Sequence, residues 1–302
     1  MLFKRLGATG VQIPEIGLGT WQYHAGAEPL RKGLDEGALF IDTAESYGTE
    51  SVVGEAIAGR RDSIFLATKV SPGHFRRADV LAAADRSLMQ LRTSYIDLYQ
   101  LHEPNDRIPV AETLGAMEEL VDAGKVRFIG VSNFSVAQLE RARAAMRKHL
   151  IVSNQVRFNL IDRTINGGLL SYCQQSHVTV LAYSPLGRRF QNIIDCDPRG
   201  VLVDLARKSG RTPAQLALNW CLCREGVVGI PKGNSIEHVV ENCRASDWRL
   251  SAEQLRELDE SILFHRRGKF EMFLRRQLPP AVKRAMKNLT CLAPRGLRRR
   301  FN

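Results

Sequence analysis

Strand-like and helix-like segments alternate along residues 16–244 of this 302-residue chain. The strand-like segments are short, rich in Ile, Val, Leu and Phe, and mostly apolar throughout, which is typical of strands buried on both faces of a parallel sheet. The predicted strands are 16–19, 39–42, 64–69, 96–101, 126–131, 152–156, 178–183 and 227–230. The predicted helices are 28–36, 50–58, 79–91, 110–123, 135–148, 168–176, 200–209, 212–223 and 236–244. Eight such pairs in ~250 residues predict an α/β protein with a (β/α)8 TIM barrel.

The alternative is an open doubly wound sheet. That fold favours a glycine-rich first turn, and the segment 17–22, Gly-Leu-Gly-Thr-Trp-Gln, lacks the third glycine. The barrel is therefore preferred. The leading segment 2–13, with a turn at 7–10, is predicted to form a β-hairpin before the barrel. Ser135, Thr212 and Ser235 are expected to be helix N-caps.

Four chemically active side chains lie at or just after the ends of successive predicted strands: Asp42, Tyr47, Lys69 and His102. Active sites of such barrels lie at the C-terminal ends of the strands. A Tyr beside an ammonium group is expected to have a lowered pKa, which suits acid–base chemistry on a carbonyl or alcohol. Taken singly, each residue has an ordinary structural explanation, such as a salt bridge for Asp42. Their joint order favours catalysis.

Further motifs follow in the same order along the chain. They are Asp42-Thr43-Ala44 with Tyr47-Gly48, Ala67-Thr68-Lys69, Leu101-His102, Gly130-Val131-Ser132-Asn133-Phe134, Ser153-Asn154-Gln155-Val156, Ala182-Tyr183-Ser184-Pro185-Leu186, Ile230-Pro231-Lys232 and Glu241-Asn242. Over residues 1–263 this pattern resembles the aldo-keto reductases. The resemblance implies a TIM barrel that binds NAD(P)H in an extended pose and reduces aldehydes or ketones to alcohols.

The resemblance also implies roles for individual residues. Tyr47 donates the proton to the carbonyl oxygen, Lys69 paired with Asp42 lowers its pKa, and His102 orients the carbonyl. Tyr183 stacks on the nicotinamide ring. The implied cofactor-binding residues are Gly19, Thr20, Trp21, Ser132, Asn133, Gln155, Tyr183, Ser184, Leu186, Lys232, Asn234, Ser235, His238, Glu241 and Asn242.

The cofactor is expected to be NADP, with NAD left open. Many NADP-preferring relatives carry an Arg where this chain has His238, and a guanidinium holds a 2′-phosphate more firmly than an imidazole. Lys232 and Ser235 can still serve. The substrate is a small carbonyl compound whose identity the sequence does not specify. Glu103, after His102, either disfavours acidic substrates or is a solvated rim residue.

A second functional class stays open. The same barrel can act as a nicotinamide-nucleotide-binding regulatory subunit with little turnover, as in the potassium-channel β-subunits that share this resemblance. The intact set of Asp42, Tyr47, Lys69 and His102 favours the enzyme.

The net charge divides the chain into a predicted barrel, 1–264, and a basic amphipathic C-terminal tail, 265–302. The tail holds twelve Lys or Arg and one acid, whereas residues 1–264 hold thirty-one of each sign. A helix is expected at 281–292. The tail is predicted either to dock on the barrel or to contact an anionic membrane surface peripherally. Nucleic-acid binding is disfavoured because no aromatic stacking platform accompanies the charge.

The six cysteines, at positions 173, 196, 221, 223, 243 and 291, form no metal-binding spacing. They are interpreted as reduced thiols, and no metal site is predicted. The N-terminus has no apolar stretch typical of a signal peptide. A cytoplasmic protein is therefore expected.

Overall fold

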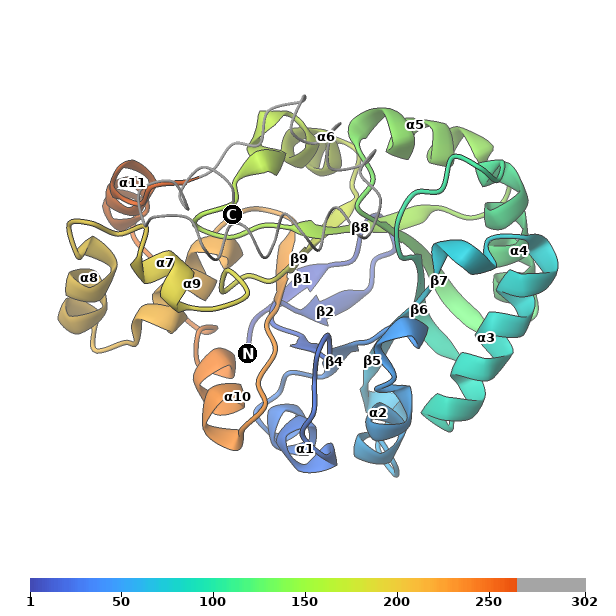
Figure 1. Ribbon diagram of the computed structural model, residues 1–302, viewed down its shortest axis with the longest axis horizontal. Coiled ribbons are helices and arrows are strands. Elements are labelled where there is room, and N and C mark those ends of the chain that lie inside the picture. Colours follow the sequence, from blue (N-terminus) through green and yellow to red (C-terminus); the bar gives the residue numbers. More distant parts are fainter. Residues whose placement is uncertain (265–302) are drawn as a thin grey trace, which may run out of the picture. The chain divides into compact units, whose positions relative to one another are not determined.

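Eight parallel strands form the central sheet of residues 1–264, the part of the chain that the computed structural model describes (Figure 1). Neighbouring strands follow the order of the chain. They are β3 (Leu18–Gly19), β4 (Phe40–Asp42), β5 (Phe65–Val70), β6 (Ile96–Leu101), β7 (Val126–Ser132), β8 (Ile151–Arg157), β9 (Thr179–Tyr183) and β10 (Val227–Ile230). All eight predicted strands are confirmed to within two residues at each end.

Backbone hydrogen bonds between the first and last strands close the sheet into a barrel. Gly17 N donates to Gly229 O at 2.8 Å, and Gly19 N donates to Pro231 O at 2.9 Å. A Cβ at position 19 would lie 2.8 Å from the carbonyl oxygen of Ile230, so only glycine permits this approach. The closed parallel barrel confirms the predicted fold class.

Helices follow the strands and surround the barrel (Figure 1). They are α1 (Ala27–Asp35), α2 (Glu50–Ala56), α3 (Arg77–Leu91), α4 (Val110–Asp122), α5 (Val136–Ala145), α6 (Leu169–Gln175), α7 (Gln191–Ile194), α8 (Val201–Ser209), α9 (Pro213–Leu222), α10 (Ile236–Cys243) and α11 (Ala252–Ser261). The side chains of Ser135, Thr212 and Ser235 cap α5, α9 and α10 as predicted. The single-turn α7 and the 3-10 turn Glu45–Tyr47 were not predicted, since both are too short to show periodicity in the sequence.

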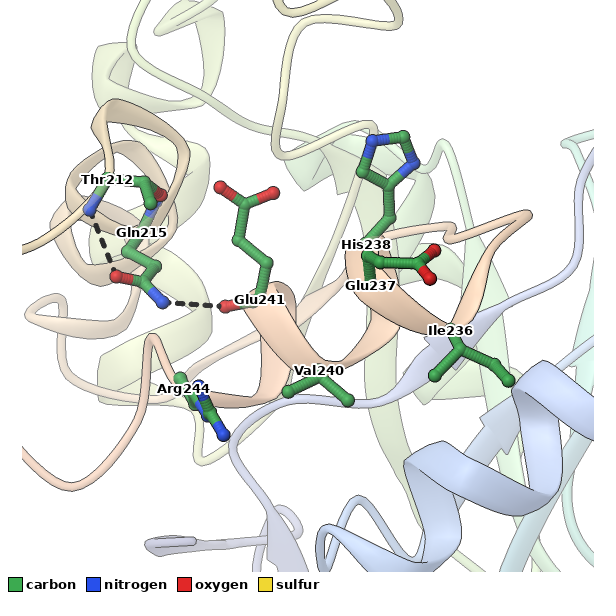
Figure 2. A pocket seen from close by; sticks show the side chains of 8 residues that line it. All are labelled: Thr212, Gln215, Ile236, Glu237, His238, Val240, Glu241 and Arg244. Atoms are coloured by element: carbon green, nitrogen blue, oxygen red, sulfur yellow. Dashed lines mark hydrogen bonds between the residues drawn. The ribbon is translucent and has the colours of Figure 1, made fainter.

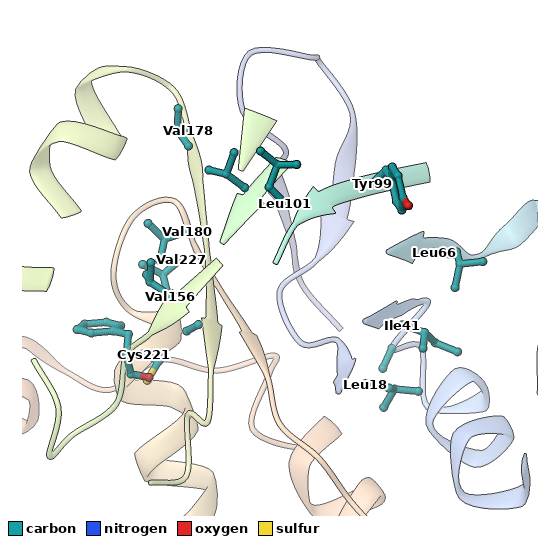
Figure 3. Packing of buried hydrophobic residues seen from close by; sticks show 14 of the residues in the cluster. Leu18, Ile41, Leu66, Tyr99, Leu101, Val156, Val178, Val180, Cys221 and Val227 are labelled. Atoms are coloured by element: carbon teal, nitrogen blue, oxygen red, sulfur yellow. The ribbon is translucent and has the colours of Figure 1, made fainter. Parts of the chain in front are cut away.

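Two apolar layers flank the strands because successive side chains point to opposite faces. Ile41, Leu66 and Tyr99 face outward and pack against the helices (Figure 3). Phe40 and Leu98 belong to a separate cluster inside the barrel. Each strand is therefore apolar on both sides, which explains why the alternation is weak in the sequence.

The predicted N-terminal hairpin is confirmed. Strand β1 (Phe3–Arg5) pairs antiparallel with β2 (Gln12–Pro14). Leu6 and Ile13 from the hairpin are fully buried in the interior cluster. The hairpin thus packs on the strand starts and fills that end of the barrel.

The expectations for the basic tail, including the helix at 281–292, concern residues outside the described range. The division of the chain at residue 264 stays a prediction. No helix within residues 1–264 is long and apolar enough to cross a membrane. Cysteines 173, 196, 221, 223 and 243 are free thiols.

Candidate active site

The four predicted catalytic residues meet at the C-terminal end of the barrel. Asp42 and Lys69 point inward from β4 and β5. Tyr47 lies in the 3-10 turn after β4, and His102 directly follows β6. The Tyr47 hydroxyl lies 3.4 Å from Lys69 Nζ and 3.3 Å from His102 Nε2. Because strand ends of a parallel barrel share one rim, residues 60 positions apart converge here.

Lys69 and Asp42 form a buried ion pair. Lys69 Nζ lies 2.6 Å from Asp42 Oδ2, and it also donates to the carbonyl oxygen of Thr43 at 2.7 Å. Both side chains are almost inaccessible to solvent. Burial lowers the pKa of Lys69, and the neighbouring Asp42 carboxylate opposes that shift. The pair leaves one ammonium proton directed at Tyr47.

The expected lowering of the Tyr47 pKa is wrong for this structure. Burial of the phenol and the nearby Asp42 carboxylate raise the pKa of Tyr47 above its ordinary value. Lys69 does not reverse the shift, because its charge is largely matched by Asp42 at a shorter distance. Tyr47 is therefore a fully protonated hydroxyl at neutral pH.

His102 is a neutral imidazole over the ordinary working range of pH. Burial and the Lys69 charge lower the pKa of His102 to about 4. Its Nδ1 lies 3.4 Å from Ser46 Oγ, and its ring packs edge-on against Tyr47. A neutral ring with one nitrogen beside the Tyr47 hydroxyl can orient an oxygen atom without adding a charge.

Gln100 is a site residue that the sequence analysis missed. It points inward from β6, and its Nε2 donates to Asp42 Oδ1 at 3.2 Å. It is fully buried. A signal was present, because Gln100 is an uncharged polar residue within the apolar strand 96–101, two positions before His102. Ser46 and Thr43, which contact His102 and Lys69, were missed as well.

Gln155, predicted only as a cofactor contact, also hydrogen-bonds to Asp42. Its Nε2 donates to the same Asp42 oxygen, Oδ1, at 2.7 Å. A register shift at Ile129/Gly130, where β7 pairs with β8, allows this position. Val152 lies in the interior cluster, and strict alternation would then turn Gln155 outward. The register shift inserts one extra residue in β8, which inverts the alternation of inward and outward side chains beyond it, so Gln155 points into the barrel.

Ser132, Asn133, Tyr183 and Ser184 lie together at the ends of β7 and β9. The Tyr183 hydroxyl donates to Asn133 Oδ1 at 3.1 Å, and Asn133 Nδ2 donates to Ser132 Oγ at 3.1 Å. Asn133 and Ser184 have left-handed backbones, with φ of 63° and 49°. Such strained non-glycine residues cluster at functional sites.

The predicted contacts after β3 lie beside Asp42. Thr20 donates through its backbone N and its hydroxyl to the Asp42 carbonyl oxygen, at 3.0 and 3.1 Å. The Trp21 ring is 41% exposed, and the Arg188 guanidinium lies 5.5 Å from its centre. Leu186 packs at the margin of the outer apolar layer. Thr20 is thus a buried support, whereas Trp21 is accessible to a ligand.

The residues predicted for the phosphate and adenosine end lie along and just before α10, with Lys232, Asn234 and Ser235 before its start and Glu241 and Asn242 in its last turn. Lys232 Nζ donates to Gln22 O at 3.0 Å, and Asn234 contacts His24. Burial lowers the pKa of Lys232. Between α9 and α10 lies an open groove of about 490 Å³ (Figure 2). His238 and Glu241 line this groove, whereas Asn242 is buried and does not.

No group of three or more His, Cys, Asp or Glu in residues 1–264 is arranged to hold a metal ion. The fold and site define the class as a (β/α)8 barrel in which Tyr47, Lys69, Asp42 and His102 form one hydrogen-bonded group at the C-terminal rim.

Known proteins are similar to this chain over most of its length. The sequence profile of the Aldo/keto reductase family matches residues 15–263. The methylglyoxal reductase YeaE of Escherichia coli (strain K12) is 36% identical over 261 residues, which cover 83% of this chain and 92% of that protein. Two crystal structures of an aldo-keto reductase from Klebsiella pneumoniae, one with NADP and acetate and one with NADPH, are 40% identical. They cover 88% of this chain and 97% and 98% of theirs, with TM-scores of 0.80 and 0.82. This chain belongs to the aldo-keto reductase family.

Proposed function

We propose that this protein reduces aldehydes or ketones to alcohols with NADPH as the hydride source. One observation carries the proposal: the protonated Tyr47 hydroxyl lies within 3.4 Å of both the Lys69 ammonium and the His102 imidazole. An oxygen atom placed beside Tyr47 and His102 receives two hydrogen-bond donors. That is the requirement for stabilising the alkoxide that forms as a carbonyl is reduced.

The raised pKa of Tyr47 suits a reductase. Reduction needs a proton donor that is still protonated when the carbonyl arrives, and Tyr47 meets this condition at neutral pH. An alkoxide is more basic than a phenolate, so proton transfer from Tyr47 remains favourable. Lys69 then stabilises the phenolate that is left, from 3.4 Å away. Bound NADPH supplies the hydride that makes the carbonyl oxygen basic.

The residues at the site fit a nicotinamide nucleotide. A carboxamide needs both donors and acceptors, and Ser132, Asn133 and Gln155 offer hydroxyl and amide groups of both kinds at adjacent strand ends. Tyr183, held through its hydroxyl by Asn133, presents a partly exposed ring. At the other end, the capped start of α10 with Lys232 suits a phosphate. Assignments of single residues to single cofactor atoms remain part of the proposal.

NADPH is preferred over NADH because Lys232, Ser235 and His238 lie together where an extra phosphate can be bound. Ser235 Oγ accepts from His238 N at 3.3 Å, so the side chain and the helix start share one surface. The bound NADP and NADPH of the Klebsiella enzyme structures agree with this choice.

The test is a panel of carbonyl compounds assayed with NADPH and NADH side by side, following the loss of nicotinamide absorbance. Methylglyoxal belongs in the panel because a relative that is 36% identical to this chain is a methylglyoxal reductase. Tyr47→Phe, assayed in parallel, is the control for the assigned chemistry. Turnover in the wild type that is lost in this variant supports the proposal. Tight NADPH binding with negligible turnover on every compound would instead support the regulatory subunit.

For the basic segment 265–302 we propose contact with an anionic membrane surface. Its charge supports this, since twelve of its residues are Lys or Arg and each is worth ~1 kcal/mol near such a surface. Sedimentation with anionic vesicles at low and high salt tests it, with a chain truncated after residue 264 as control. Salt-sensitive binding by the full chain alone is expected. An absence of binding rejects the contact. A cytoplasmic location likewise stays a proposal, based on the free thiols.

A further inference from the structure

Two buried amides converge on one oxygen of Asp42. Gln100 Nε2 lies 3.2 Å from Asp42 Oδ1 and Gln155 Nε2 lies 2.7 Å from the same atom. The second oxygen, Oδ2, is held by Lys69 Nζ. The carboxylate is thus fixed by neutral donors on one side and by a cation on the other.

The two amides also contact each other. Gln155 Nε2 lies 3.4 Å from Gln100 Oε1, so the Gln100 amide donates to Asp42 and accepts from Gln155. Within residues 1–264, every hydrogen bond of the Gln155 side chain to a neighbour uses Nε2. Its Oε1 is left to accept from a ligand. Gln100 therefore helps to decide which end of the Gln155 amide faces the site.

The barrel makes space for the Gln100 side chain. Gln100 pairs in register with Lys69 on one side and with Gly130 on the other. A Cβ at Gly130 would lie 3.0 Å from Gln100 Cγ and 2.5 Å from Ser153 Oγ. The glycine leaves room for a long polar side chain in an interior layer that a larger neighbour would fill. Ser153 shares this layer, and its buried hydroxyl has no hydrogen-bond partner among residues 1–264.

We propose that Gln100 is a positioning residue that couples the seat of the nicotinamide carboxamide to the Asp42–Lys69 pair. This inference rests on the proposed function. Gln100 orients Gln155 so that Oε1 faces the carboxamide, and at the same time it fixes Asp42 and through it Lys69. A carboxamide bound on Gln155 then stabilises the catalytic ion pair in one arrangement. Gln100 itself touches neither cofactor nor substrate.

The test compares two nucleotides in three proteins. The nucleotides are NADP⁺ and its 3-acetylpyridine analogue, in which a methyl ketone replaces the carboxamide and so removes the NH₂ donor. The proteins are the wild type, Gln100→Met, which keeps the chain length but removes the amide, and Ser153→Ala. Ser153→Ala is a matched control because it lies in the same layer and loses only an unbonded hydroxyl. Dissociation constants are measured by quenching of tryptophan fluorescence.

Gln100→Met is expected to weaken NADP⁺ binding roughly tenfold, the typical effect of losing an interaction of this kind. The acetylpyridine analogue has no NH₂ group for Gln155 Oε1 to accept from, so its binding should change little. Turnover with NADPH should fall while KM for the carbonyl substrate is unchanged. Ser153→Ala should match the wild type throughout.

Equal weakening of both nucleotides by Gln100→Met would overturn the inference, because it would indicate general loosening of the site. Unchanged NADP⁺ binding would overturn it as well. Should Gln100→Met fail to fold, Gln100→Leu also removes the amide that donates to Asp42 without adding a charge, and the same discrimination between nucleotides is expected. A wild type that neither binds NADP⁺ nor reduces a carbonyl would contradict the proposed function. A competent wild type with no discrimination in the variants would contradict only the role of Gln100.

Discussion

The two ends of the barrel interior are built from the same strands but have opposite chemistry. Near the strand starts, Phe40, Phe65 and Leu98 form a dry cluster closed by the hairpin. Two residues further along β4 and β6, Asp42 and Gln100 replace that apolar surface with a hydrogen-bonded polar layer. The first end is stabilised by apolar packing. The second holds the buried Asp42–Lys69 ion pair, and the hydrogen bonds that Asp42 accepts from Gln100 and Gln155 help to offset the cost of burying these charges.

Because of this difference, substitutions at the two ends of one strand are expected to affect different properties, stability at one end and activity at the other. Buried apolar side chains can be exchanged for others of similar volume at modest cost. A buried charge cannot lose its partner without a large penalty, and the partner here, Lys69, also lies 3.4 Å from the Tyr47 hydroxyl. Substitutions at the apolar end should therefore change stability alone, whereas those at the polar end should change activity with or without stability.

Lys69→Met gives the largest expected effect because it alters both properties. The variant leaves the buried Asp42 carboxylate without its cation, which typically costs ~3–5 kcal/mol of unfolding free energy. Activity should also fall sharply, because nothing then stabilises the Tyr47 phenolate. Urea unfolding and steady-state assays measure the two losses. Full activity with an unchanged pH profile would show that Lys69 has a structural role only.

Tyr47→Phe should separate the two properties at the polar end. The loss of a general acid typically lowers the rate ~10²- to 10⁴-fold. The phenol hydroxyl makes only long hydrogen bonds within the described residues 1–264, of 3.3 and 3.4 Å, so folding and NADPH binding should be retained. Measurements of kcat and of NADPH affinity on the same preparation test whether activity is lost while cofactor binding is retained. Near-normal turnover would remove Tyr47 from the mechanism.

Ile13→Ala, at the apolar end, is expected to lower stability and leave activity unchanged. Ile13 is fully buried in the hairpin at the strand-start end of the barrel, and such a truncation typically costs ~2–5 kcal/mol. The midpoint of thermal unfolding should fall, while kcat and KM measured well below it stay at wild-type values. A lowered kcat in the folded variant would mean that the two ends of the barrel are coupled.

His102 should make the stability of the polar end depend on pH. Its folded-state pKa of about 4 lies below the ordinary 6.5, so the unfolded chain binds the proton more readily. The neutral ring therefore contributes stability above pH 6.5 that is lost as pH falls toward 4. Between these limits the wild type should lose up to about 3 kcal/mol more than His102→Gln. Chemical unfolding at pH 7.5 and 4.5 tests this, and parallel losses in both proteins would contradict it.

Lys232→Ala should have the smallest effect, at the rim of the polar end. Lys232 is partly exposed, and its removal should weaken NADPH roughly tenfold while NADH changes less, because only NADPH carries the 2′-phosphate. His238→Arg should act in the opposite direction. The ratio of KM values for the two cofactors is the measurement. Equal effects of Lys232→Ala on both cofactors would show that this lysine does not contact the 2′-phosphate.

The strand pattern and the residues at strand ends were readable from the sequence because they follow from local chemistry. A parallel strand buried on both faces must be apolar along its length, and a barrel must bring its strand ends to one rim. Asp42, Tyr47, Lys69 and His102 could therefore be placed together from their positions alone. The hairpin and the capped starts of α5, α9 and α10 followed from turn and capping residues in the same way.

The direction of the Tyr47 pKa shift and the position of Gln155 depended on three-dimensional contacts. The family resemblance implied that Lys69 pairs with Asp42, but the sequence did not show that this pairing largely matches the ammonium charge, nor how little solvent reaches the phenol. The register shift between β7 and β8, which turns Gln155 inward beside Gln100, arises from pairing between strands and leaves no trace in the spacing of residues. Periodicity and residue type thus determined the barrel and the convergence of Asp42, Tyr47, Lys69 and His102 at one rim. Burial and strand register, which exist only once distant segments pack, decided how those residues are charged and held.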